Sequence, residues 1–74
     1  MKKLKELGMN TEVIRKLVDL WVYKREHREI FFDKLESNKT YEQIAEEKNL
    51  TPQRIKDIVY EVRDLIIEKY TLSR

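Results

Sequence analysis

The stretch from Thr40 to Val62, TYEQIAEEKNLTPQRIKDIVYEV, reads as two helices joined by a tight corner. Thr40 and Gln43 form a capping box, because each side chain can bond the backbone N–H of the other at a helix start. Asn49 tolerates the left-handed backbone that ends many helices. Thr51 suits a helix cap, and Pro52 suits the first helical position. The pattern therefore predicts one helix that ends just before Asn49 and a second that begins at Pro52.

The apolar residues of this stretch repeat at helical spacing. Those on the inward faces are Tyr41, Ile44 and Ala45, then Ile55, Ile58, Val59 and Val62. Ala45 is small enough to let two helix backbones approach, and Leu50 can fill the corner. This is the layout of a helix-turn-helix, whose second helix enters the major groove of DNA by its N-terminal end. A corner between two helices of any small bundle is the alternative reading.

The composition indicates one small all-α domain. The chain has 74 residues, of which 41% are charged and 41% hydrophobic. One glycine and one proline leave almost nothing with which to form strand turns. A chain of this size buries only about 60% of its unfolded surface, so dimerisation would add useful apolar contact. We predict a small helical bundle, a single domain over residues 1–74, with 40–62 as its helix-turn-helix core and a long last helix for recognition.

Several features argue against an enzyme. The chain has no cysteine, one histidine (His27) and one glycine, which leaves no thiolate metal site, no histidine cluster and no phosphate-cradling loop. Acidic and basic residues follow one another at helical offsets, as they do on solvated faces. We therefore predict no catalytic residue, no metal and no cofactor. No continuous apolar segment resembles a signal peptide or a membrane span. The absence of cysteine fits a cytoplasmic protein.

The segments before the corner are less regular. Residues 1–9 read as a flexible basic arm, which would either touch DNA phosphate or, as we prefer, remain a solvated terminus. Asn10 can cap a helix over the next dozen residues. Residues 23–27, YKREH, predict a break near Lys24 and Arg25. A further helix then ends near Ser37.

The first and last helices carry more apolar residues than one inward face requires. The stripe of the first helix is Ile14, Leu17, Val18 and Trp21, widened by Val13 and Leu20; the last helix continues through Leu65, Ile66 and Tyr70, with Ile67 and Leu72 off its stripe. Additional apolar positions of this kind are consistent with a homodimer that forms through these two helices. Isolated exposed aliphatic side chains are also normal on a monomer.

Polar side chains at the start of the last helix belong to types that read DNA. Glutamine bonds adenine on two edges, arginine and lysine prefer guanine, and a carboxylate accepts from cytosine. Backbone N–H groups at a helix start attract phosphate. We predict base contacts from Gln53, Arg54, Lys56, Asp57 and Tyr60, and phosphate contacts from Lys39, Thr40, Tyr41 and Thr51. Arg54 could serve either role, and Asp57 also repels the DNA backbone. The net charge of +2 neither demands nor excludes nucleic acid.

Three runs resemble region four of the bacterial sigma factors: REIF at 28–31, TYEQIAEE at 40–47 and LTPQRIK at 50–56. In that family this domain reads the upstream promoter element through a helix-turn-helix. By that likeness Gln53, Lys56 and Asp57 match base-reading positions, while Thr51 and Arg54 match backbone or base contacts. The family usually has Leu-Gly where this chain has Lys48-Asn49, and the other sigma regions are missing. The resemblance implies a small sigma-like regulator of phage or plasmid type, not a complete sigma factor.

We therefore expect a sequence-specific DNA-binding transcriptional regulator. Its expected partners are double-stranded DNA, a second copy of the chain and RNA polymerase, with no membrane. The alternative is a protein-interaction module, antitoxin-like or an adaptor, that uses the helical corner only as a scaffold. Its working surface would be the apolar residues Leu20, Val22, Ile67 and Leu72.

Overall fold

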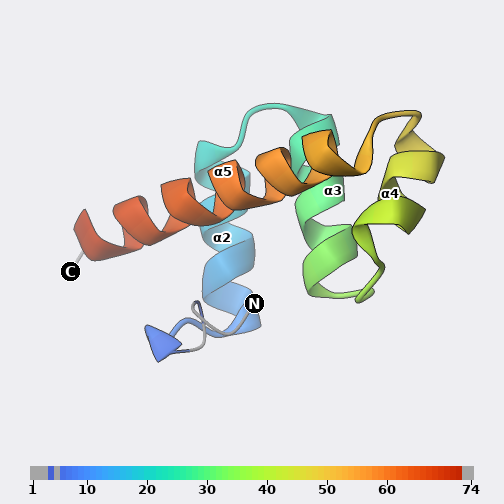
Figure 1. The fold of residues 1–74 in the computed structure, drawn as a ribbon. Helices are drawn as coiled ribbons and strands as arrows, with labels where there is room; N and C mark the ends of the chain where they lie inside the picture. Colours follow the sequence, from blue (N-terminus) through green and yellow to red (C-terminus); the bar gives the residue numbers. More distant parts are fainter. Residues whose placement is uncertain (1–3, 5, 73–74) are drawn as a thin grey trace.

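The computed structural model describes residues 4 and 6–72, and the described part is helical without a strand (Figure 1). The helices are α2 (Thr11–Trp21), α3 (Arg25–Leu35), α4 (Tyr41–Lys48) and α5 (Pro52–Leu72). The predicted all-α class is confirmed, and so is the long last helix. None of the described helices combines the length and apolarity needed to cross a membrane.

Helix α5 is the element against which the others pack. It contacts α2, α3 and α4, and α3 also contacts α4. Figure 1 shows α5 running across the other helices, with α4 beside its N-terminal end. The completely buried side chains come from every helix and include Val18, Ile30, Phe31, Ile44, Ile55, Val59 and Ile66. One continuous apolar core therefore fixes the start of α5 relative to α4.

The predicted break between the first two helices is present. Asn10 caps α2 through its Oδ1, which accepts from the backbone N–H of Val13 at 2.9 Å. Helix α2 ends at Trp21, and α3 begins at Arg25. Val22, in the extended link, is only 5% exposed, so its predicted place on an interaction surface is wrong. Once the chain leaves the helix, the apolar side chain turns into the core.

The corner between α4 and α5 forms as the sequence predicts. Thr40 and Gln43 make both bonds of the capping box, at 3.1 and 2.9 Å. Asn49 is left-handed, with φ 59° and ψ 42°. The backbone N–H of Leu50 then donates to the carbonyl of Ala45 at 2.9 Å, which closes the end of α4. These local bonds set where α5 starts.

The segment before α2 differs in part from its prediction. Leu4 is completely buried and Met9 is 3% exposed, and both belong to the core. These two residues are therefore not part of a solvated arm. Scattered apolar residues without a helical period gave no sign of this packing in the sequence. The basic residues Lys2, Lys3 and Lys5 lie outside the described residues.

Candidate nucleic-acid interface

The start of α5 forms an exposed tip. The hydroxyl of Thr51 accepts from the backbone N–H of Arg54 at 3.2 Å, and Pro52 occupies the first helical position. All four residues from Thr51 to Arg54 are exposed. The first turn contains no acidic residue, so the positive end of the helix dipole is not neutralised within it. This tip can therefore approach a negatively charged ligand.

The predicted base-contact residues continue from the tip along one side of α5. Gln53, Arg54, Asp57 and Tyr60 are exposed, and Lys56 is half-buried. The Gln53 side chain is not free, because its Nε2 donates to Oδ1 of Asp57 at 2.9 Å. The structure therefore brings these five residues together on one helix, with two of them already bonded to each other.

Tyr60 lies between two cationic side chains. The Lys56 ammonium is 5.6 Å from its ring centroid and the Arg63 guanidinium 4.6 Å. Arg63 also bonds the carboxylate of Asp64 at 2.9 and 3.1 Å. The sequence reasoning missed Arg63, although it follows Tyr60 by three residues and so shares its face of the helix. Arg63 therefore adds a cationic group beside Tyr60, although its charge is balanced by Asp64.

Tyr41 links the start of α4 to the middle of α5. Burial raises the pKa of the Tyr41 phenol, and a hydrogen bond with Tyr60 raises it further. The Lys34 ammonium lies 4.7 Å from the Tyr41 ring centroid. Lys34 was also missed, because its approach to Tyr41 across the α3–α4 loop depends on how the chain folds back. A predicted phosphate contact on α4 and a predicted base contact on α5 are thus neighbours.

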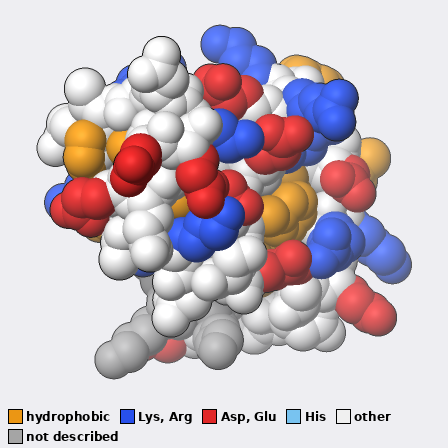
Figure 2. All heavy atoms as spheres, turned by 90° about the vertical axis from the view of Figure 1, so that its right-hand side faces the viewer, with side chains coloured by type: hydrophobic (Ala, Val, Ile, Leu, Met, Phe, Trp, Pro, Cys, Tyr) orange, Lys and Arg blue, Asp and Glu red, His pale blue; other side chains and the backbone are white. Residues whose placement is uncertain are grey.

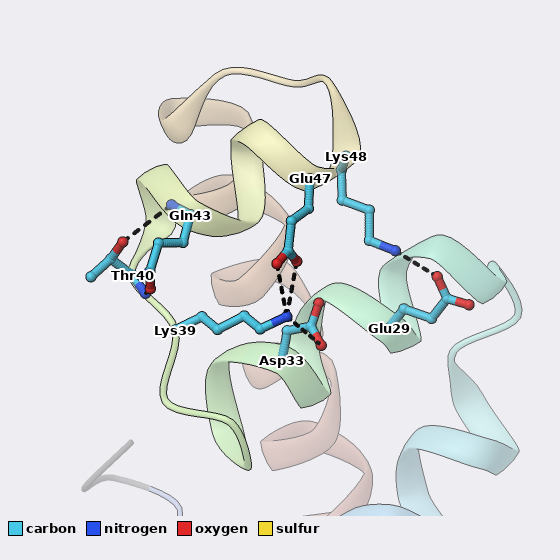
Figure 3. A network of polar contacts seen from close by, with 7 residues as sticks. All are labelled: Glu29, Asp33, Lys39, Thr40, Gln43, Glu47 and Lys48. Carbon is cyan, nitrogen blue, oxygen red and sulfur yellow. Dashed lines mark hydrogen bonds and ion pairs between the residues drawn. The ribbon is translucent and has the colours of Figure 1, made fainter.

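The Lys39 ammonium is bound by carboxylates and is therefore not free for the phosphate contact predicted for it (Figure 3). Its ammonium bonds both carboxylate oxygens of Glu47, at 2.9 and 3.0 Å, and lies 4.0 Å from Asp33. The hydrogen bond to Glu47 raises the pKa of Lys39, with burial acting in the opposite direction. Lys39 therefore ties α4 to α3. The nearby Thr40 hydroxyl accepts within the capping box, and its O–H can still donate to phosphate.

A second ion pair joins the same two helices. Lys48 donates to Glu29 at 2.7 Å (Figure 3), and this bond lowers the pKa of the Glu29 carboxyl. The family resemblance leads one to expect an apolar residue at position 48. The lysine instead uses its charge to hold the end of α4 against α3.

Changing Lys48 to glutamine should alter how stability depends on pH. The pKa of Glu29 is lowered in the folded state, so the pair stabilises the fold above the unfolded-state pKa and this contribution is lost as pH falls through the folded-state pKa. Urea midpoints of parent and variant should differ slightly at neutral pH and converge in acid. Lys16→Gln, at an exposed position of α2, is the control. Equal separation at both pH values would contradict the linkage.

The exposed surface of α4 is more acidic than the tip of α5. Figure 2 looks onto the side where α4 lies in Figure 1 and shows acidic and basic side chains intermingled. Exposed acidic residues of α4 are Glu42, Glu46 and Glu47. Such a surface would repel DNA phosphate if α4 lay along the duplex. The first turn of α5 has no acidic residue, whereas Glu42 lies in the first turn of α4, so the tip of α5 is the less acidic of the two helix starts.

The chain was also compared with known proteins. Comparison with protein-family models, with curated proteins and with solved structures gives no match. The likeness to sigma region four therefore stays a hypothesis carried by the sequence runs themselves. In the described residues no group of three potential ligands could hold a metal ion. Half-buried His27 contributes instead to a pocket with Trp21 and Tyr23.

Proposed function

We propose that this protein is a sequence-specific DNA-binding regulator that places the start of α5 in the major groove. The observation that carries the proposal is the exposed tip from Thr51 to Arg54, followed by Asp57 and Tyr60 on the same helix. The capping bonds and the buried contacts of α4 hold this helix at a fixed angle. A rigid rod with a polar, accessible end is what groove reading requires.

The proposed roles follow from the chemistry of each group. Gln53 would read adenine, while Lys56 and Arg54 would bond guanine or phosphate. Thr40, Tyr41 and Thr51 would contact phosphate at the two helix starts. Arg63 would join them by exchanging its exposed carboxylate partner, Asp64, for phosphate. Lys39 has no place in this set, because its ammonium is held by Glu47. The protein would act in the cytoplasm, by occupying a promoter site or by contacting RNA polymerase.

Selection on random duplexes should yield an enriched sequence, and two substitutions should weaken binding to it. Gln53→Ala and Lys56→Ala each remove one base contact, so each should reduce affinity by roughly tenfold. Both positions lie on the outside of α5, so the helical circular dichroism should not change. Lys16→Ala on α2 is the control for loss of positive charge. Unaltered binding by both α5 variants at physiological salt would refute this assignment of the interface.

Exposed apolar side chains on α2 and at the end of α5 favour a second candidate function, binding of another protein. Leu20 is 64% exposed and Leu72 is 72% exposed. A pocket of about 240 Å³ lies nearby, lined in part by Trp21, Tyr23 and Leu65. A homodimer through α2 and α5 would cover this surface. Because Ile67 is half-buried, its side chain would contribute little to the dimer contact.

Salt separates the two candidates. If Arg54, Lys56 and Arg63 each neutralise one phosphate, affinity should fall about 40-fold between about 50 and 200 mM salt. Apolar contact between proteins should hardly respond. A palindromic selected sequence would indicate a two-fold dimer on DNA, because half-site symmetry mirrors protein symmetry.

A further inference from the structure

The hydrogen bond between Gln53 and Asp57 fixes the direction of the glutamine amide. Nε2 of Gln53 donates to Oδ1 of Asp57 at 2.9 Å, one helical turn further along α5. An ionised carboxylate can only accept hydrogen bonds. The amide must therefore turn its NH₂ group toward Asp57 and its carbonyl oxygen away. One N–H and the carbonyl of Gln53 remain available to a ligand.

This orientation distinguishes the two purines. In the major groove adenine offers a donor at N6 beside an acceptor at N7, whereas guanine offers acceptors at both O6 and N7. A fixed amide with one outward oxygen and one outward N–H matches adenine. Against guanine, the carbonyl of Gln53 would face O6, and two acceptors would meet. A glutamine free to rotate could present both hydrogens of its NH₂ group to guanine.

We propose that Asp57 is a positioning residue, whose carboxylate holds the Gln53 amide so that this position selects adenine over guanine. The inference rests on the proposed function and replaces the direct base contact that the sequence suggested for Asp57. This positioning role also accounts for a carboxylate at position 57, where its charge repels the DNA phosphates. Asp57 acts here through Gln53 and needs no contact with a base.

Asp57→Asn is the decisive variant because it keeps the size of the side chain while it removes the negative charge and the acceptor-only character of the carboxylate. An asparagine can face Gln53 with either its oxygen or its NH₂ group, so the glutamine amide can then turn both ways. Binding is measured to duplexes with A·T or G·C at the base pair that Gln53 reads. That base pair is identified as the one whose replacement no longer matters in Gln53→Ala.

In the parent, adenine should be preferred at this base pair, and Asp57→Asn should reduce the preference by roughly twofold, because a Gln–Asp hydrogen bond at this helical spacing is weak. Asp57→Glu retains a carboxylate and should keep most of it. In the Gln53→Ala background, Asp57→Asn should leave the purine ratio unchanged. This pattern of ratios would not arise if Asp57 only stabilised the helix.

Asp64→Asn is the control for loss of a negative charge, and it also releases Arg63 from its carboxylate partner. Asp64 is exposed and lies two turns further along the same face of α5. Both asparagine variants should raise affinity for all duplexes, and only Asp57→Asn should change the purine ratio. An adenine preference that survives in Asp57→Asn, or that falls equally in Asp64→Asn, would overturn the positioning role. A parent that binds no duplex at all would instead refute the proposed function, and this inference with it.

Discussion

Phe31→Ala is expected to remove much of the stability of the folded state. Phe31 is completely buried on α3, and truncating a buried phenylalanine costs about 3–5 kcal/mol. At about 0.05–0.15 kcal/mol per residue, a chain of this length has a total stability of roughly 4–11 kcal/mol. Urea unfolding followed by far-ultraviolet circular dichroism should show a large drop in midpoint, or no cooperative transition at all.

Phe32→Ala provides the comparison on the neighbouring residue. Phe32 is half-buried, and its ring meets that of Phe31 edge-on, with centroids 6.0 Å apart. It should lose some aromatic contact and the nearby cation of Arg15, 5.0 Å from its ring centroid, but leave the core filled. We expect a clearly smaller loss than for Phe31→Ala. Equal losses would mean that α3 presents a different face to the core.

Ala45→Leu is expected to damage the corner between α4 and α5. Ala45 is 3% exposed and its carbonyl accepts the bond from Leu50 that closes α4. Three added carbon atoms have no space there, and overpacking of a core typically costs about 1–3 kcal/mol. Because the added bulk tilts α4 against α5, DNA affinity should fall together with the urea midpoint. Both are measured on the same preparations.

The adjacent position supplies the control for Ala45→Leu. Glu46 is exposed on the outer side of α4, so Glu46→Leu adds a leucine to the same helix without entering the core. Its urea midpoint should stay close to that of the parent. If Ala45→Leu were equally well tolerated, the close approach of the two helices would not depend on the small side chain.

The parts of the fold that could be predicted are those decided within one or two helical turns. The caps at Thr40 and Thr51 and the left-handed Asn49 depend on neighbours in the sequence, and each is found where it was predicted. The burial of Ile55 and its stripe follows equally from spacing. Local chemistry therefore determined where the helices begin and end.

The parts that could not be predicted depend on which segments meet after folding. Burial of Leu4 needs the chain before α2 to return to the core, and nothing in its own spacing indicates this. Lys39 looked like a phosphate ligand until the fold placed Glu47 beside it. The approach of Lys34 to Tyr41 likewise depends on the path of the loop. The sequence thus indicated which helix presents the exposed polar residues, but not which of the nearby charges are paired.

The contact between α2 and α5 gives the molecule an optical reporter. Trp21 is the one tryptophan of the chain, is 38% exposed, and has the Lys69 ammonium 4.2 Å from its ring centroid. Undocking of α2 would bring the indole into full contact with water and shift its emission to longer wavelength. Fluorescence would then follow this contact alone, while ellipticity follows all helices. Coinciding curves would establish that the bundle unfolds in one step.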